Sequence, residues 1–364
     1  MAADHEYRYV PESVLPPGAT IAEILEDRGI TQGDFALLLG RTEKNVSQLV
    51  NGKAPVNHDT ALELERVLGV PASFWNNAEA RYRDSLARQR EDAVLAGEAE
   101  WANRFPLKAM ADHDWIARES SPSEQAAEVL RFFGTASPQA WEDYWASPKR
   151  LAARMTAAYT VDIPSLTAWL RQGELMAQTV HTAPYDARRF GEVVVDARTM
   201  TRAPVDQAFA ALRESCASAG VALVPVPELP NIRCSGVSRW LGPSKALIQL
   251  CLRYKSADQL WFSFFHEAAH ILKHDHRRTY VQGLGAGSTE ELEADQFASD
   301  LLIPRAAYKT LLADKPLSSK KVGAFADEIG VAPGIVVGRL QHDGAVPFGH
   351  MNGLKVKVDW GEYA

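Results

Sequence analysis

The sequence lacks the features of a membrane-embedded or secreted protein. It has no run of about 18 uncharged apolar residues, the length that a helix needs to cross a bilayer. The first residues, MAADHEYRYV, have neither the basic start nor the apolar stretch of a signal peptide. We therefore expect a soluble, cytoplasmic protein without membrane contacts.

Cysteine is also scarce. The sequence has Cys216, Cys234 and Cys251, which are widely spaced and form no CxxC pair. Their odd number and spacing argue against a disulfide framework and against a zinc site built from thiolates. We interpret them as small buried apolar side chains.

An excess of positive charge is missing as well. The formal net charge is −7, so any contact with DNA must come from a local patch. At 364 residues and 46% hydrophobic composition, the chain is long and apolar enough for several domains.

Pattern changes along the chain predict a multidomain protein with four segments. Glycine-punctuated helices and a charged helical connector suggest an all-α domain over residues 1–92, and residues 93–190 suggest a helical region of unassigned role. Residues 191–312 combine helices with the β-rich runs EVVVDA, GVALVPV, CSGVSRWL and ALIQLCL, which predicts an α+β domain. Residues 313–364 predict a small helical element and an extended tail. That element is either a second helix-turn-helix or packing support for the α+β domain, and we prefer the second interpretation.

Residues 32–51 have the spacing of a helix-turn-helix. Ala36 is small where two helices must touch, Gly40 is at the turn, and Thr42 is suited to cap the second helix. That helix would expose polar side chains able to reach base edges in the major groove, and Gln32 could contact a phosphate. The predicted DNA contacts are Gln32, Lys44, Asn45, Ser47 and Gln48.

This segment resembles the helix-turn-helix domains of the XRE family, and GKAPVNHDTALELERVLGVPASFW is similar to their HigA-like antitoxin branch. The resemblance covers about residues 16–82 and implies binding to operator DNA. Arg41 at the turn and the excess of acids over bases in residues 1–80 favour an alternative in which the helices serve docking or dimerisation. Arg81, Arg83, Arg88 and Arg90 offer a compensating basic patch.

The segment DQLWFSFFHEAAHILKH predicts a buried helix with Asp258 near its N-cap. Its HEAAH places His266 and His270 one turn apart, so that both imidazoles can face one metal ion, while Glu267 is offset toward a water on that ion. A tetrahedral catalytic zinc needs a third protein ligand. His274 is about 12 Å along the helix from His266, too far to share an ion with it.

The remaining candidates for the third ligand are Glu290, Glu291 and Glu293, on a second predicted helix from residue 290 to 302. Glu291 shares an inward stripe with Ala294, Asp295, Ala298 and Leu302. Glu293 lies on another face of the helix with Phe297 and Asp300, and because Phe297 is apolar, Glu293 stays the alternative ligand. Asp295 would then accept a hydrogen bond from the second ring nitrogen of a ligating histidine. If Glu291 is the ligand, replacing Glu293 should have little effect on zinc affinity.

HEAAH followed by ELEADQFASDLLIP resembles the ImmA/IrrE family of metallopeptidases over about residues 191–305. The resemblance implies a gluzincin-like fold and a Zn²⁺ cofactor. It also implies that His266, His270 and Glu291 are metal ligands and that Glu267 is the catalytic base. Asp295 stands where the family usually has asparagine.

Peptide hydrolysis also needs a donor to the developing oxyanion. The candidates are His274, His276 and Tyr280. By analogy with related peptidases, the predicted strand at residues 246–252 would pair with an extended substrate.

Together the motifs and the two resemblances imply a regulatory zinc metallo-endopeptidase with a DNA-binding domain, which we expect to cleave a repressor-like protein or the chain itself. The alternative is an antitoxin-like transcriptional repressor, with a toxin as partner, whose zinc domain is a sensor or a structural module. The intact Glu267 favours the enzyme, because a structural zinc site needs no base. We also expect a homo-oligomer.

Overall fold

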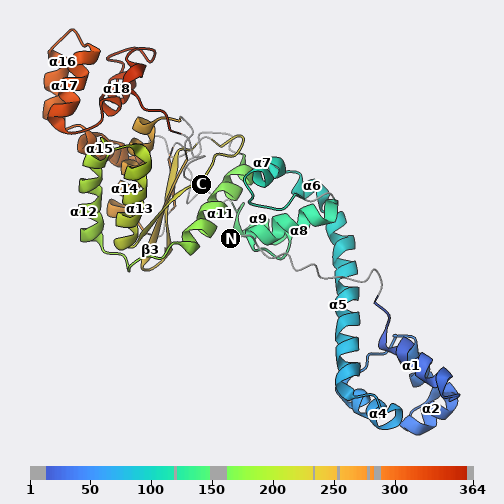
Figure 1. The fold of residues 1–364 in the computed structure, drawn as a ribbon. Coiled ribbons are helices and arrows are strands. Elements are labelled where there is room, and N and C mark those ends of the chain that lie inside the picture. The colour runs from blue at the N-terminus through green and yellow to red at the C-terminus, as the bar shows by residue number, and fades with distance from the viewer. Residues whose placement is uncertain are drawn as a thin grey trace. The chain divides into compact units, whose positions relative to one another are not determined.

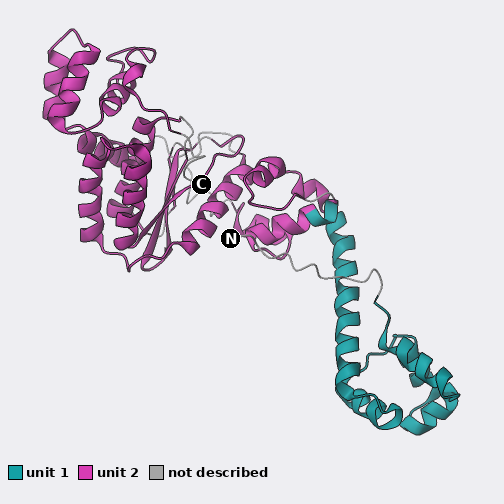
Figure 2. Ribbon diagram, viewed as in Figure 1, with its two compact units in different colours: residues 1–97, 122–124 teal, residues 98–121, 125–364 magenta. Residues whose placement is uncertain are grey.

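The computed structural model describes residues 14–118, 121–147, 162–232, 234–251, 255–276, 279–282 and 288–358. It divides into two compact units (Figure 2). Unit 1 comprises residues 1–97 with 122–124, and unit 2 comprises residues 98–121 with 125–364. The expected multidomain organisation is confirmed. No helix in the described ranges is both long and apolar enough to cross a bilayer.

Unit 1 is helical. Its helices are α1 (Pro17–Asp27), α2 (Gln32–Leu39), α3 (Glu43–Val50), α4 (His58–Leu68) and α5 (Ala72–Ala96). They enclose an apolar core that includes Ile21, Phe35, Val46, Leu64 and Trp75, all fully buried.

The turn between α2 and α3 follows from local chemistry. Thr42 accepts a hydrogen bond from the backbone N–H of Asn45 and so caps α3, as expected. Gly40 ends α2 with a φ of 63°, a left-handed conformation that favours glycine. Ala36 is buried, in line with its small size at the helix contact.

Unit 2 begins with short helices around an aromatic cluster. The cluster consists of Trp101, Phe105, Phe133, Trp141 and Trp145, whose rings meet mostly edge to face. The helices are α6 (Ala99–Ala102), α7 (Leu107–Asp112), α8 (Pro122–Phe133) and α9 (Pro138–Tyr144). The described part of this region is helical, as predicted.

A four-stranded sheet is the centre of unit 2. Its strands are β1 (Val221–Pro225), β2 (Gly236–Gly242), β3 (Lys245–Leu250) and β4 (Tyr280–Val281). The order is β1-β3-β2-β4, with β1 parallel to β3 and the other pairs antiparallel.

Helices cover both faces of the sheet (Figure 1). One face carries α12 (Ala187–Met200), α13 (Val205–Ser218) and α14 (Ala257–Lys273), and the other carries α11 (Ile163–Thr179). Gln249 of β3 points toward α11, where Gly173 leaves it room, because a Cβ on Gly173 would lie 1.8 Å from its Oε1.

After α14 the chain is again helical. The elements are α15 (Thr289–Leu302), α16 (Arg305–Ala313), α17 (Ser319–Ile329), α18 (Pro333–His342) and a short 3-10 turn η1 (Asn352–Leu354). Side chains of α17 and α18 belong to the same apolar cluster as those of α14 and the sheet. In this structure the C-terminal helices therefore pack on the α+β core.

Two sequence-based assignments on unit 2 are wrong. The run EVVVDA is not a strand but part of α12, because Phe190, Val194 and Ala197 are buried at helical spacing while Val195 is 58% exposed. The strand at residues 246–252 cannot receive a substrate by edge pairing, because β3 already has β1 and β2 on its two sides. Residues 252–254 lie outside the described ranges.

Helix α14 begins close to Asp258, as the sequence predicts. Its N-cap is Ser256, and Asp258 makes no capping hydrogen bond. Asp258 is instead 5% exposed and pairs with Lys355, whose Nζ lies 2.8 Å from Oδ2. Of the expected extended tail, Leu354 still belongs to η1, the backbone is extended at Lys355, and Lys357 bridges to Ser256. Residues 359–364 are outside the described part.

Candidate metal centre

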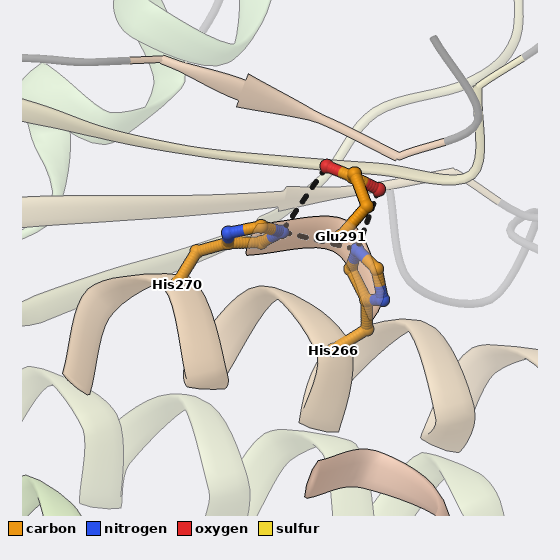
Figure 3. Close-up of side chains that lie close together, drawn as sticks. All are labelled: His266, His270 and Glu291. Atoms are coloured by element: carbon orange, nitrogen blue, oxygen red, sulfur yellow. Dashed lines mark hydrogen bonds and ion pairs between the residues drawn. The ribbon is translucent and has the colours of Figure 1, made fainter. Parts of the chain in front are cut away.

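Three buried side chains from two helices meet in unit 2. His266 and His270 lie one turn apart on α14, and Glu291 lies in the first turn of α15, where Ser288 caps the helix. Figure 3 shows both imidazoles pointing from α14 toward the carboxylate of Glu291. One potential ligand atom from each residue lies within 4.8 Å of the others.

The spacing of these atoms fits a tetrahedral metal ion. The two histidine Nε2 atoms are 3.1 Å apart, and they lie 3.3 Å (His266) and 3.4 Å (His270) from the nearer oxygens of Glu291. Ligand bonds of about 2.0 to 2.1 Å at a tetrahedral angle separate two ligand atoms by roughly 3.3 Å. The donor set of two imidazoles and one carboxylate is one that zinc accepts.

The second ring nitrogen, Nδ1, of each histidine makes a hydrogen bond. Nδ1 of His266 is 2.8 Å from Oδ1 of Asp295. Nδ1 of His270 is 2.8 Å from Nδ1 of His274, whose Nε2 is 3.1 Å from Oε2 of Glu293. If His266 and His270 keep their protons on Nδ1, both leave Nε2 free for a metal.

Glu267 has an unusual environment. Its side chain is fully buried, and its carboxylate oxygens make no hydrogen bond of ordinary length and angle in the described chain, although the hydroxyl of Ser238 on β2 is close enough to lower its pKa. Burial raises the pKa of this carboxyl to about 8. A buried carboxylate next to a possible metal site is suited to act as a general base.

Glycine on β2 makes room for this carboxylate. A Cβ on Gly236 would lie 2.8 Å from Oε1 of Glu267. The sequence analysis missed Gly236, although a glycine inside a predicted strand is a known sign of close backbone approach.

The carboxylates give the site a strong preference for positive charge. Burial alone would lower the pKa of His266, but its hydrogen bonds to Asp295 and Glu291 and the charge of Glu267 raise it to about 10. Burial would raise the pKa of Glu291, but hydrogen bonds from His266 and His270 lower it to about 2. Burial lowers the pKa of His270. A cluster with this charge balance suits a bound cation.

The three candidate oxyanion donors lie in different surroundings. Tyr280 stacks on His270, with ring centroids 4.2 Å apart, and pairs with Ser238 in the sheet. His274 is held between His270 and Glu293. His276 stacks on Trp240 at 4.0 Å. Tyr280 and His274 are thus the two candidates that contact His270 of the cluster.

In unit 1, Lys44, Asn45 and Gln48 are exposed on α3 and Ser47 is half-buried, while Gln32 is exposed at the start of α2. The turn residue Arg41 does not face outward as a free cation. Its guanidinium lies 2.7 Å from Glu63 and donates a hydrogen bond to Thr60.

The basic patch expected on α5 is partly neutralised within the helix. Arg83 pairs with Glu79, and Arg88 pairs with Asp84. These pairs reduce the positive charge that the patch offers to DNA.

Comparison with known families gives two matches. A family model described as helix-turn-helix matches residues 21–75. A model of peptidase family M78, described as IrrE N-terminal-like domain, matches residues 249–341, a range that contains the whole cluster.

Solved structures similar to the chain include two antidote proteins. One is a putative antidote protein of a plasmid maintenance system from Nostoc punctiforme, with 30% identity, coverage of 21% of this chain and 84% of that chain, and a TM-score of 0.20. The other is an addiction module antidote protein of a HigA family from Coxiella burnetii, with 26% identity, coverage of 23% and 94%, and a TM-score of 0.22. A search of curated proteins found no match.

Proposed function

Because the chain joins an XRE-type helix-turn-helix domain to an IrrE-like peptidase domain, we propose that it is a regulatory zinc metallo-endopeptidase that cleaves a repressor-like protein. Cleavage takes place in trans or on the chain itself, and it controls transcription. Unit 1 brings the enzyme to operator DNA.

One observation carries the enzymatic part of the proposal. The ligand atoms of His266, His270 and Glu291 lie within 4.8 Å of one another, and the carboxylate of the adjacent Glu267 is fully buried without an ion-pair partner among the described residues. A purely structural metal site needs only the three ligands. Burial of the Glu267 carboxylate costs free energy, and its use as a catalytic base explains why that cost is kept.

Each side chain then has a separate task. His266, His270 and Glu291 would hold Zn²⁺, which when bound acidifies a water and polarises the scissile carbonyl. Glu267 takes the proton from the attacking water onto its carboxylate and returns it to the leaving amine. Asp295 and His274 orient the two histidines, and the Tyr280 hydroxyl donates to the developing oxyanion.

The DNA-binding part is supported by the α2–turn–α3 geometry and by the exposed polar face of α3. Lys44, Asn45 and Gln48 have the side-chain types that read base edges, and Gln32 at the start of α2 is suited to a phosphate. Binding to a toxin and homo-oligomerisation stay predictions.

The experiment combines metal analysis with a cleavage assay. The purified full-length protein should contain about one zinc per chain, and it should cleave the repressor-like product of a neighbouring gene or itself. A chelator should abolish cleavage, and added zinc should restore it.

The matched control is Glu267→Gln, which removes the base but keeps the size of the side chain. This variant should bind zinc and DNA and leave the substrate intact. Zinc-loaded wild-type protein that binds operator DNA but cleaves neither itself nor a neighbouring repressor would favour the alternative, an antitoxin-like repressor with a sensing or structural zinc domain.

A further inference from the structure

Alternate side chains of β2 point to opposite faces of the sheet. Arg239 points toward α11, where its guanidinium donates a hydrogen bond to the carbonyl oxygen of Leu170. Because side chains alternate along a strand, the residues next to Arg239 point to the other face, which α14 covers. Gly236 and Ser238 both lie on that face, and Gly236 contacts Glu267 there.

Ser238 lies beside the metal cluster. It is fully buried and pairs across the sheet with Tyr280, whose ring stacks on His270. On its other side Ser238 pairs with Ile248, which belongs to the same apolar cluster as side chains of α14. These neighbours place the Ser238 side chain against the helix that carries the two histidines and Glu267.

The hydroxyl of Ser238 lies close to the carboxylate of Glu267. Burial raises the pKa of this carboxyl, whereas the charge of His266 and the Ser238 hydroxyl lower it. Among the described residues, neither Oγ of Ser238 nor either oxygen of Glu267 makes a hydrogen bond of ordinary length and angle. Buried polar atoms without a partner cost free energy, and rotation about single bonds lets these two groups satisfy each other.

We propose that Ser238 is a positioning residue for Glu267. Its hydroxyl donates a hydrogen bond to one carboxylate oxygen and so leaves the other oxygen directed toward the three ligands. The last torsion of a glutamate side chain has no sharp preference of its own, so contacts must fix the plane of the carboxylate. Gly236 supplies a steric contact and Ser238 a hydrogen bond, both from β2. This role rests on the proposed function of Glu267 as the base.

The kinetic test is Ser238→Ala, measured on a substrate that the wild type cleaves. We expect kcat to fall about tenfold or more, as loss of a hydrogen bond to a charged group does, with KM within about twofold of the wild type. Zinc affinity, measured by chelator competition, should stay within about twofold, because no ligand and no group that orients a ligand is changed. A wild-type kcat would overturn the proposal.

The matched control is Thr167→Val, which removes another fully buried hydroxyl without changing the size of the side chain. Thr167 is on α11, on the other side of the sheet from α14. This variant should turn over like the wild type. A loss of kcat equal to that of Ser238→Ala would show that the effect is not specific to Glu267, which would also overturn the proposal.

A double variant tests whether Ser238 acts through Glu267. Ser238→Ala combined with Glu267→Ala should cleave as slowly as Glu267→Ala alone in long incubations, since no carboxylate is left to position. A further loss as large as that seen in the wild-type background would show that Ser238 acts independently of Glu267.

Crystal structures of the zinc-loaded proteins test the contact without catalysis. The wild type should show the Ser238 hydroxyl hydrogen-bonded to Glu267, and in Ser238→Ala the carboxylate should turn into the space that Oγ leaves. An unchanged carboxylate in the variant, or an active wild type without the hydrogen bond, would overturn the positioning role alone. A zinc-loaded wild type that has the hydrogen bond but cleaves no protein would refute the proposed function, and with it the role of Ser238.

Discussion

Gly236 and Glu267 are in direct contact: a Cβ on Gly236 would lie 2.8 Å from both Cγ and Oε1 of Glu267. The strand backbone of β2 therefore forms one wall of the space that holds the proposed base. Because Glu267 is fully buried, it has no solvent-filled space into which it can withdraw.

Gly236→Ala should displace the carboxylate and lower turnover by tenfold or more, at a stability cost of about 1–3 kcal/mol for overpacking. Zinc content should not change, because the ligands belong to other side chains. The control is Gly242→Ala on the same strand, where an added Cβ meets nothing within 4 Å. Equal turnover of both variants and the wild type would show that the contact has no catalytic role.

Glu267→Ala should keep its metal and lose about 10²- to 10⁴-fold in turnover, the usual contribution of a general base. Zinc content and kcat are measured on the same preparation. A variant that turns over like the wild type would assign the base to another residue.

The acids of α15 should differ in their effect on the metal. Asp295→Ala should weaken zinc binding about 10- to 100-fold, as losses of groups that orient a ligand do, and Glu291→Ala should weaken it more. Chelator competition measures both affinities. The control is Asp300→Asn, which removes an acid of α15 that pairs with Arg305. If the Glu291→Ala variant binds zinc as tightly as the wild type, Glu291 is not a ligand.

From the sequence, replacing Glu293 should hardly change zinc affinity, but the structure shows a contact of Glu293 that helical periodicity alone does not predict. Glu293 contacts His274, which in turn contacts His270. We therefore expect Glu293→Gln to weaken zinc binding about tenfold, by loosening the orientation of His270.

The double variant His274→Ala with Glu293→Gln tests this path. If Glu293 acts through His274, the double variant should bind zinc little more weakly than His274→Ala alone. Strictly additive reductions in zinc affinity would show that the two residues act independently.

Lys44→Ala with Gln48→Ala should weaken operator binding by about 1–3 kcal/mol for each base that the variant no longer reads. Arg66→Ala removes one positive charge from the exposed side of α4 and is the control for charge alone. Gel-shift titrations at fixed salt compare the variants. If the Lys44→Ala, Gln48→Ala double variant and the Arg66→Ala variant both bind operator DNA as tightly as the wild type, α3 does not read the operator.

Much of the local structure could be predicted from the sequence. Thr42 as a helix cap, Gly40 at the turn and the inward stripe of α15, apart from the exposed Asp295, depend on interactions within a few residues, so residue order alone indicates them. The spacing of His266 and His270 is fixed in the same way, by one turn of helix.

Other features depend on contacts between distant segments. EVVVDA has the composition of a strand, but its place in α12 depends on which of its faces the core covers. Sequence could not show that β3 lies between two strands, since pairing joins residues far apart in the chain.

The sequence by itself determined which residue types are available for the site: two histidines one turn apart, an adjacent glutamate and a nearby acidic helix. Only the tertiary structure decided that Gly236 faces Glu267, that Glu293 contacts His274, and that Asp258 in the first turn of α14 pairs with Lys355. The physical reason is that helical periodicity fixes the direction of a side chain relative to its own helix, whereas its partner is fixed by the packing of a second element.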